Sequence, residues 1–92
     1  MEKKITDKGL VNASAEKCFW VHNGPILKNS KELLDALKKM KRPTFTHHVN
    51  KGKNDFSKWI KEVLGDNQLA EALEKARTKQ EFIKNIRKKL AS

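Results

Sequence analysis

The chain has 92 residues, enough for one domain with a single modest core, and its 21 lysines and arginines against 11 acidic residues give a net charge of +10. No apolar run approaches the roughly 20 residues of a membrane-spanning helix, and the basic start lacks the apolar stretch of a secretory signal. Cys18 is the only cysteine and excludes an internal disulfide. We therefore expect a soluble, cytoplasmic monomer that does not associate with membranes.

The first 27 residues show no sustained helical period. Residues 1–15 mix charged residues with Gly9, Asn12 and Ser14, which predicts a flexible N-terminal arm followed by a single small helical domain over residues 16–92. Residues 17–27 (KCFWVHNGPIL) place apolar and aromatic side chains around a turn at Gly24-Pro25. This segment is either a short extended piece or a capping turn, and its aromatic residues should cover the helical core.

Helical spacing begins at Asn29, which stands three residues before Glu32 as an N-cap and its capping-box partner. The apolar stripe of this first predicted helix ends near Lys41 and consists of Leu33, Leu34, Leu37 and Met40. Pro43 suits the first turn of a second, short helix. That helix carries Phe45, His48 and Val49 on one side, and Gly52 ends it.

Three further helices follow. Asn54 or Asp55 caps the first of them, whose apolar stripe is Phe56, Trp59, Ile60, Val63 and Leu64. Gly65 ends it, and Asp66 caps the next helix, with Leu69, Ala72, Leu73 and Ala76 inward. Thr78 and Glu81 form a second capping box before a last helix with Phe82, Ile83, Ile86 and Leu90 inward. The sequence predicts an all-α fold, a compact bundle of about five short helices with an irregular or short extended N-terminal segment packed on it.

Two segments hold most of the positive charge. Residues 28–42 contain six basic and two acidic residues, and residues 74–92 contain seven basic and two acidic ones. Helical spacing puts Lys31, Lys38 and Arg42 on one face of the first helix, and Arg77, Lys84 and Lys88 on one face of the last. These faces are solvated surfaces, the result of a general lysine enrichment, or a phosphate-binding surface where the two helices meet. A membrane-surface helix fits less well, because no basic face carries exposed Trp or Phe.

Metal binding and catalysis are weakly supported. Cys18 and His22 form a C-x3-H pair and His47 and His48 are adjacent, but no second Cys, H-x3-H or HExxH accompanies them. Nucleophilic catalysis needs Cys18 or a serine beside a base that an acid holds in place. Within its aromatic run, Cys18 is better suited to being a small buried thiol. We expect no catalytic residue, no metal and no cofactor, and therefore not an enzyme.

Residues 44–60 (TFTHHVNKGKNDFSKWI) are better explained as a polar clasp between two helices. His48 would lie on the inner face and hydrogen-bond a backbone carbonyl or an aspartate, while Asn50 and Asn54 close the turn around Gly52. We expect His48 and Asp55, or their neighbours, to be hydrogen-bonded and largely buried. Trp59 would be the central core residue, packed against Phe45 and residues 18–21. The outward-facing side chains, available for ligand contact, would be His47, Lys51 and Lys53.

Three stretches together resemble a family of small uncharacterised archaeal proteins, a domain of unknown function: CFWVHNGPILKNSKELLDAL, TFTHHVNKGKNDFSKWI and EVLGDNQLAEALEKA. The family pattern is FWV-x-x-G, then TF-x-x-HVN-x-x-KNDF-x-x-W, then Gly-Asp. The resemblance covers about residues 16–90 and implies no activity. It marks as signature residues Trp20, Gly24, Phe45, His48, Asn50, Asn54, Asp55, Phe56, Trp59, Gly65 and Asp66.

The charge distribution favours a small basic binding protein that contacts nucleic acid or a ribonucleoprotein non-specifically through phosphates. The candidate binding residues are Lys31, Lys38, Arg42, Lys51, Lys53, Arg77, Lys84 and Lys88. Because we expect the aromatic residues to be buried in the core, few aromatic side chains are left on which single-stranded bases could stack. The alternative is a protein–protein interaction adaptor with an acidic partner and the clasp as its recognition edge.

Overall fold

The computed structural model describes residues 4–5 and 11–91. Five α-helices lie within these residues: α1 (Ser30–Lys39), α2 (Arg42–His48), α3 (Asp55–Trp59), α4 (Asn67–Lys75) and α5 (Lys79–Ala91). Three antiparallel strand pairs accompany them: β1 (Lys4–Ile5) with β2 (Val11–Asn12), β3 (Phe19–Trp20) with β4 (Ile26–Leu27), and β5 (Val49–Asn50) with β6 (Lys53–Asn54). The predicted five helices are confirmed, but the fold is not purely all-α, because short hairpins join or precede the helices.

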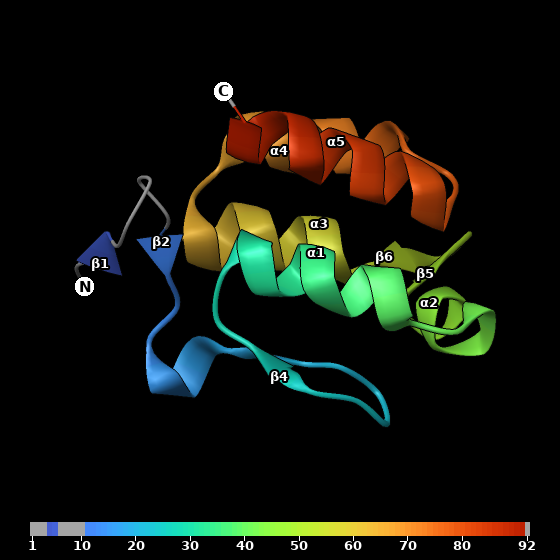
Figure 1. Ribbon diagram of the computed structural model, residues 1–92, viewed down its shortest axis with the longest axis horizontal. Coiled ribbons are helices and arrows are strands. Elements are labelled where there is room, and N and C mark those ends of the chain that lie inside the picture. Colours follow the sequence, from blue (N-terminus) through green and yellow to red (C-terminus); the bar gives the residue numbers. More distant parts are fainter. Residues whose placement is uncertain (1–3, 6–10, 92) are drawn as a thin grey trace.

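The helices pack around one core (Figure 1). The first helix, α1, lies along α5, while α4 lies against both α5 and α3. The β3–β4 hairpin follows the side of α1 away from α5, and α2 lies at the end of the molecule where α1 finishes. Helices from the two ends of the domain are therefore neighbours, which places its two most basic segments side by side.

Phe56, on α3, is at the centre of the core. It is fully buried, and its ring centroid lies 4.9 Å from that of Phe19 and 6.1 Å from that of Phe82. Trp59 is also buried, but it packs 5.7 Å from Phe19 and donates its indole N–H to the carbonyl of Lys17 at 2.8 Å. Trp59 is thus a core residue packed against the segment of residues 18–21, as predicted, with its polar ring edge turned toward the N-terminal backbone.

Local side-chain caps set the helix starts as predicted. Asn29 accepts from the Glu32 amide at 2.8 Å, Asp66 from the Leu69 amide at 3.1 Å, and Thr78 from the Glu81 amide at 3.1 Å. Asn54 rather than Asp55 caps α3, because its Oδ1 accepts from the Ser57 amide at 3.1 Å. Each bond satisfies an amide that the helix itself leaves without a partner.

The middle of the chain departs from the predicted helix ends. The second helix stops at His48, and Gly52 lies instead in the turn between β5 and β6, where Val49 pairs with Asn54. The third helix continues after Trp59 as a π-helical turn, η3 (Ile60–Leu64), before Gly65 ends it with φ of 72°. That left-handed conformation suits glycine and explains the predicted stop. On α4, Ala70 is buried while Ala72 is only half-buried.

The β3–β4 hairpin turns one aromatic residue outward. Phe19 pairs with Leu27, and both face the core, whereas Trp20 pairs with Ile26. Since side chains alternate across a strand, these two point to solvent, with 72% of Trp20 and 52% of Ile26 exposed. The expectation that Trp20 covers the core is wrong.

The predicted flexible arm, residues 1–15, falls partly on residues outside the described ones. In its described end, Val11 and Ala13 pack against the core, and the Ala13 amide donates to the Lys28 carbonyl at 2.7 Å. Ala15–Lys17 then form a short 3-10 turn, η2.

Candidate functional site

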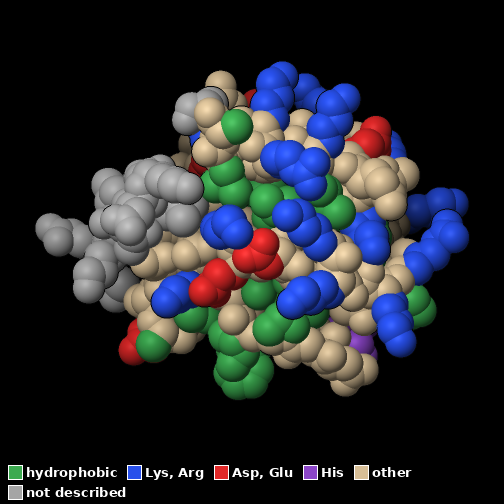
Figure 2. Space-filling model, in the orientation of Figure 1, with side chains coloured by type: hydrophobic (Ala, Val, Ile, Leu, Met, Phe, Trp, Pro, Cys, Tyr) green, Lys and Arg blue, Asp and Glu red, His purple; other side chains and the backbone are tan. Residues whose placement is uncertain are grey.

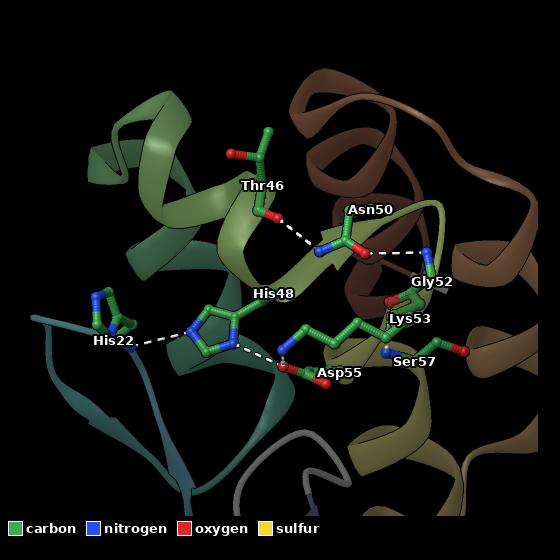
Figure 3. Close-up of polar contacts among 9 residues, drawn as sticks. His22, Thr46, His48, Asn50, Gly52, Lys53, Asp55 and Ser57 are labelled. Atoms are coloured by element: carbon green, nitrogen blue, oxygen red, sulfur yellow. Dashed lines mark hydrogen bonds and ion pairs between the residues drawn. The ribbon is translucent and has the colours of Figure 1, made fainter.

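His48 and Asp55 link the end of α2 to the start of α3 (Figure 3). The Nδ1 atom of His48 lies 2.9 Å from Oδ2 of Asp55, and only 5% of the histidine is exposed. The predicted hydrogen bond within the clasp is confirmed. Asp55 is half-buried and also receives the Lys53 ammonium at 3.0 Å.

The hydrogen bonds around His48 assign its tautomer. The backbone N–H of His22 donates to Nε2 at 3.0 Å, so Nε2 must carry a lone pair and Nδ1 the proton that Asp55 accepts. Both ring nitrogens are thereby occupied, and Nε2 faces a backbone amide. A general base needs a nitrogen within reach of a substrate proton, so this arrangement serves to join three segments of chain.

The Asp55 carboxylate is stabilised in its charged form. Partial burial would raise the pKa of Asp55, but the hydrogen bonds from His48 and Lys53 outweigh it and hold that pKa below its usual range. The charged carboxylate in turn suits its two donors.

The amides of the clasp are equally committed to backbone partners. Asn50 donates to the Thr46 carbonyl at 3.0 Å and accepts from the Gly52 amide at 3.0 Å (Figure 3). Asn54 donates to the Leu73 carbonyl at 3.0 Å, which joins the β5–β6 hairpin to α4. These contacts show that the asparagine side chains of the clasp stabilise the local backbone structure.

His22 and His47 stack on the surface beside the clasp, with ring centroids 4.1 Å apart and planes inclined by 15°. Both side chains are exposed, as predicted for His47. Desolvation beside its neighbours, and then electrostatic interactions with His22, His48 and Lys53, lower the pKa of His47. Among the described residues, no group of three or more His, Cys, Asp or Glu side chains is arranged to hold a metal ion. Cys18 is half-buried and its thiol donates to the Ser14 carbonyl.

The basic residues gather on the neighbouring helices α1 and α5. In Figure 2, which has the orientation of Figure 1, lysine and arginine side chains spread over this face, with a small acidic group near its middle. We call this area the α1–α5 surface and define it by five exposed residues. They are Lys31, Lys38, Lys84, Arg87 and Lys88. Lys31 is paired with Asp35 at 3.1 Å, while the other four have no ion-pair partner among the described residues.

The remaining candidate residues divide between two places. Arg42 is the first residue of α2 and Arg77 precedes α5, so neither belongs to the helix face predicted for it. Both line one pocket where α1 ends and α5 begins. Lys51 and Lys53 lie on the β5–β6 turn and on β6, away from α1 and α5 in the chain, and Lys53 binds Asp55.

The candidate binding residues chosen from the sequence did not include two cations, Arg87 and Lys79. Arg87 lies three residues after Lys84, so the helical period that selected Lys84 and Lys88 could also have selected it. Lys79 donates to the Met40 carbonyl at 2.6 Å, a contact between residues 39 apart that no local signal reveals.

Among the described residues, no helix is both long and apolar enough to cross a bilayer.

Comparison with known proteins supports the resemblance to a family of unknown function. No curated protein and no solved structure matches the chain. A family model does match, over residues 14–92, and its description is a family of unknown function, DUF5752. Because the match covers nearly the whole chain, the protein belongs to the DUF5752 family.

Proposed function

We propose that this protein binds nucleic acid without sequence specificity, through contacts between the α1–α5 surface and backbone phosphates. The observation that carries the proposal is the packing of α1 along α5, which joins the exposed cations of the two most basic segments into one area. A surface of exposed lysine and arginine side chains suits the regular array of phosphates on a duplex, because each contact releases condensed counterions. Nothing in this arrangement requires a catalytic group.

A salt series tests the proposal directly. Binding to unrelated DNA and RNA duplexes is measured by fluorescence anisotropy at increasing salt concentration. If four or five phosphates are contacted, the logarithm of the association constant should fall with the logarithm of the salt concentration with a slope of about −4. Similar affinities for unrelated sequences support a non-specific mode, and the absence of binding at low salt contradicts the proposal.

The exposed pair Trp20 and Ile26 favours a second candidate, a protein-interaction adaptor with an acidic partner. An outward aromatic residue beside an aliphatic one on a hairpin is typical of the anchor of a small interface, and His47 and Lys53 on the neighbouring clasp would meet acidic side chains. Capture of a partner that survives nuclease treatment, and is lost in both W20A/I26A and H47A/K53A, supports the adaptor. Loss of the captured material on nuclease treatment favours nucleic acid instead.

A further inference from the structure

A pocket of about 400 Å³ opens where the start of α2 meets the start of α5. Arg42, Phe45 and Thr46 line it from α2, and Arg77, Lys79 and Gln80 line it from the other side. The chain has three arginines against eighteen lysines, so two of its three guanidinium groups border one cavity. Neither guanidinium has a hydrogen-bond or ion-pair partner among the described residues, and no described acidic residue lines the cavity.

Lys79 adds a third cation in a fixed position. Its ammonium donates to the Met40 carbonyl at 2.6 Å, which holds the beginning of α5 against the end of α1. An ammonium has three N–H donors, so two remain for a ligand. Phe45 forms a buried apolar wall and packs edge-on against Phe82 at 5.1 Å, which anchors that wall in the core.

The site depends on these side chains and not on the backbone amides at the N-terminus of α5. The Glu81 carboxylate already accepts from the amides of Arg77 and Thr78, at 2.6 and 3.1 Å. The Thr78 hydroxyl accepts in turn from the Glu81 amide. These backbone hydrogen bonds lower the pKa of Glu81, so its charge persists beside the pocket and offsets part of the positive field. A net positive charge remains from the three lining cations.

We infer that this pocket binds a phosphate monoester, and that its natural ligand is the terminal phosphate of a nucleic-acid strand lying on the α1–α5 surface. A guanidinium group can donate two parallel hydrogen bonds to two oxygens of one phosphate, a planar geometry that lysine does not supply. A monoester carries close to two negative charges at neutral pH, which three cations can balance. The pocket lies where α1 ends and α5 begins, so a strand on that surface would bring its end to the cavity. The strand part of this inference rests on the proposed function, whereas monoester binding does not.

The first test uses a nucleoside monophosphate alone and follows the backbone amide resonances of residues 78–80 by NMR. The monophosphate should shift these resonances with a dissociation constant of about 1 mM, and the matching nucleoside should not. R42Q/R77Q should weaken binding about tenfold or more. R42K/R77K, which keeps the charge, should recover only part of it. K58Q/K61Q removes two exposed charges elsewhere and should bind normally.

Folding and the source of the phosphate are checked separately. Because both arginine side chains are exposed, the variants should melt like the parent. The parent should bind a 5′- or 3′-phosphorylated oligonucleotide several-fold more tightly than its hydroxyl-ended counterpart, and R42Q/R77Q should lose the difference. Monophosphate binding without any preference for phosphorylated ends overturns the strand as the source and identifies a free nucleotide. Monophosphate binding with no oligonucleotide binding overturns the proposed function and leaves the pocket in place. Absence of any shift with the monophosphate overturns the pocket, whatever the oligonucleotides do.

Discussion

The imidazole of His48 joins three segments of the chain through two hydrogen bonds, with Nδ1 2.9 Å from Asp55 Oδ2 and Nε2 3.0 Å from the His22 amide. The ring thus connects the β3–β4 turn, the end of α2 and the start of α3. The ring itself is buried, so its removal takes from the core side of the clasp both the acceptor of the His22 amide and one donor of Asp55.

His48→Ala should lower the free energy of unfolding by about 1–3 kcal/mol, because the His22 amide loses its acceptor and Asp55 one of its donors. Urea denaturation measures the change. The neighbouring variant, His47→Ala, removes an exposed ring and should stay within about 0.5 kcal/mol of the parent. A larger loss of stability for His47→Ala than for His48→Ala would show that His47, and not His48, is the buried ring of the clasp.

The stability contributed by Asp55 should disappear in acid. Its folded-state pKa lies below the ordinary value, because the bonds from His48 and Lys53 outweigh the effect of burial. Such a carboxylate stabilises the fold fully above its unfolded pKa, about 3.9, and ceases to do so as the pH falls through the lower folded value. Asp55→Asn should therefore be less stable than the parent at neutral pH, and the two should converge below about pH 4. A constant difference in melting temperature between pH 7 and pH 2 is the contrary result.

Truncation of the two tryptophans should lower the stability by very different amounts. Trp59→Ala removes a buried ring and its hydrogen bond to Lys17, and should cost about 3–5 kcal/mol. Trp20→Ala removes an exposed ring and should cost about 0.5 kcal/mol or less. Thermal and urea unfolding of the two variants make the comparison, and a Trp59→Ala curve close to the parent would refute the packing described for α3.

Asn54→Ala should destabilise the protein by about 1–3 kcal/mol, since its amide both caps α3 and donates to the Leu73 carbonyl. Asn67→Ala is the matched control, because Asn67 is an exposed residue at the start of α4. It should change the free energy of unfolding by about 0.5 kcal/mol or less. Equal effects of the two substitutions would count against the bridging role of Asn54.

The helical part of the fold could be predicted because its signals are local. A cap such as Asn29 with the Glu32 amide involves residues three apart, and each apolar stripe repeats within a few turns. The hairpins could not, since a two-residue strand has too few positions to show alternation. The outward side of Trp20 depends on its pairing with Ile26, and the end of α2 at His48 depends on Val49 pairing with Asn54.

The candidate sites show the same division. The pairing of His48 with Asp55 could be predicted, because the two are seven residues apart in a stretch whose polar residues need partners. The bond from His22 and the shared pocket of Arg42 and Arg77 could not, because packing alone brings residues so distant in the chain together. Helical spacing did find Lys38, Lys84 and Lys88, whose exposure on α1 and α5 is a property of each helix.

The salt dependence of duplex binding, compared between two variants of equal net charge, tests the central claim most directly. Three exposed lysines are replaced by glutamine in each variant, on the α1–α5 surface in one and on α3, η3 and α4 in the other. The surface variant is K38Q/K84Q/K88Q and the control is K58Q/K61Q/K75Q. If the surface contacts phosphates, the surface variant should lose about three units of the salt slope and the control almost none. Equal losses in the two variants would show that net charge alone attracts the duplex, and would contradict a binding surface formed by α1 and α5.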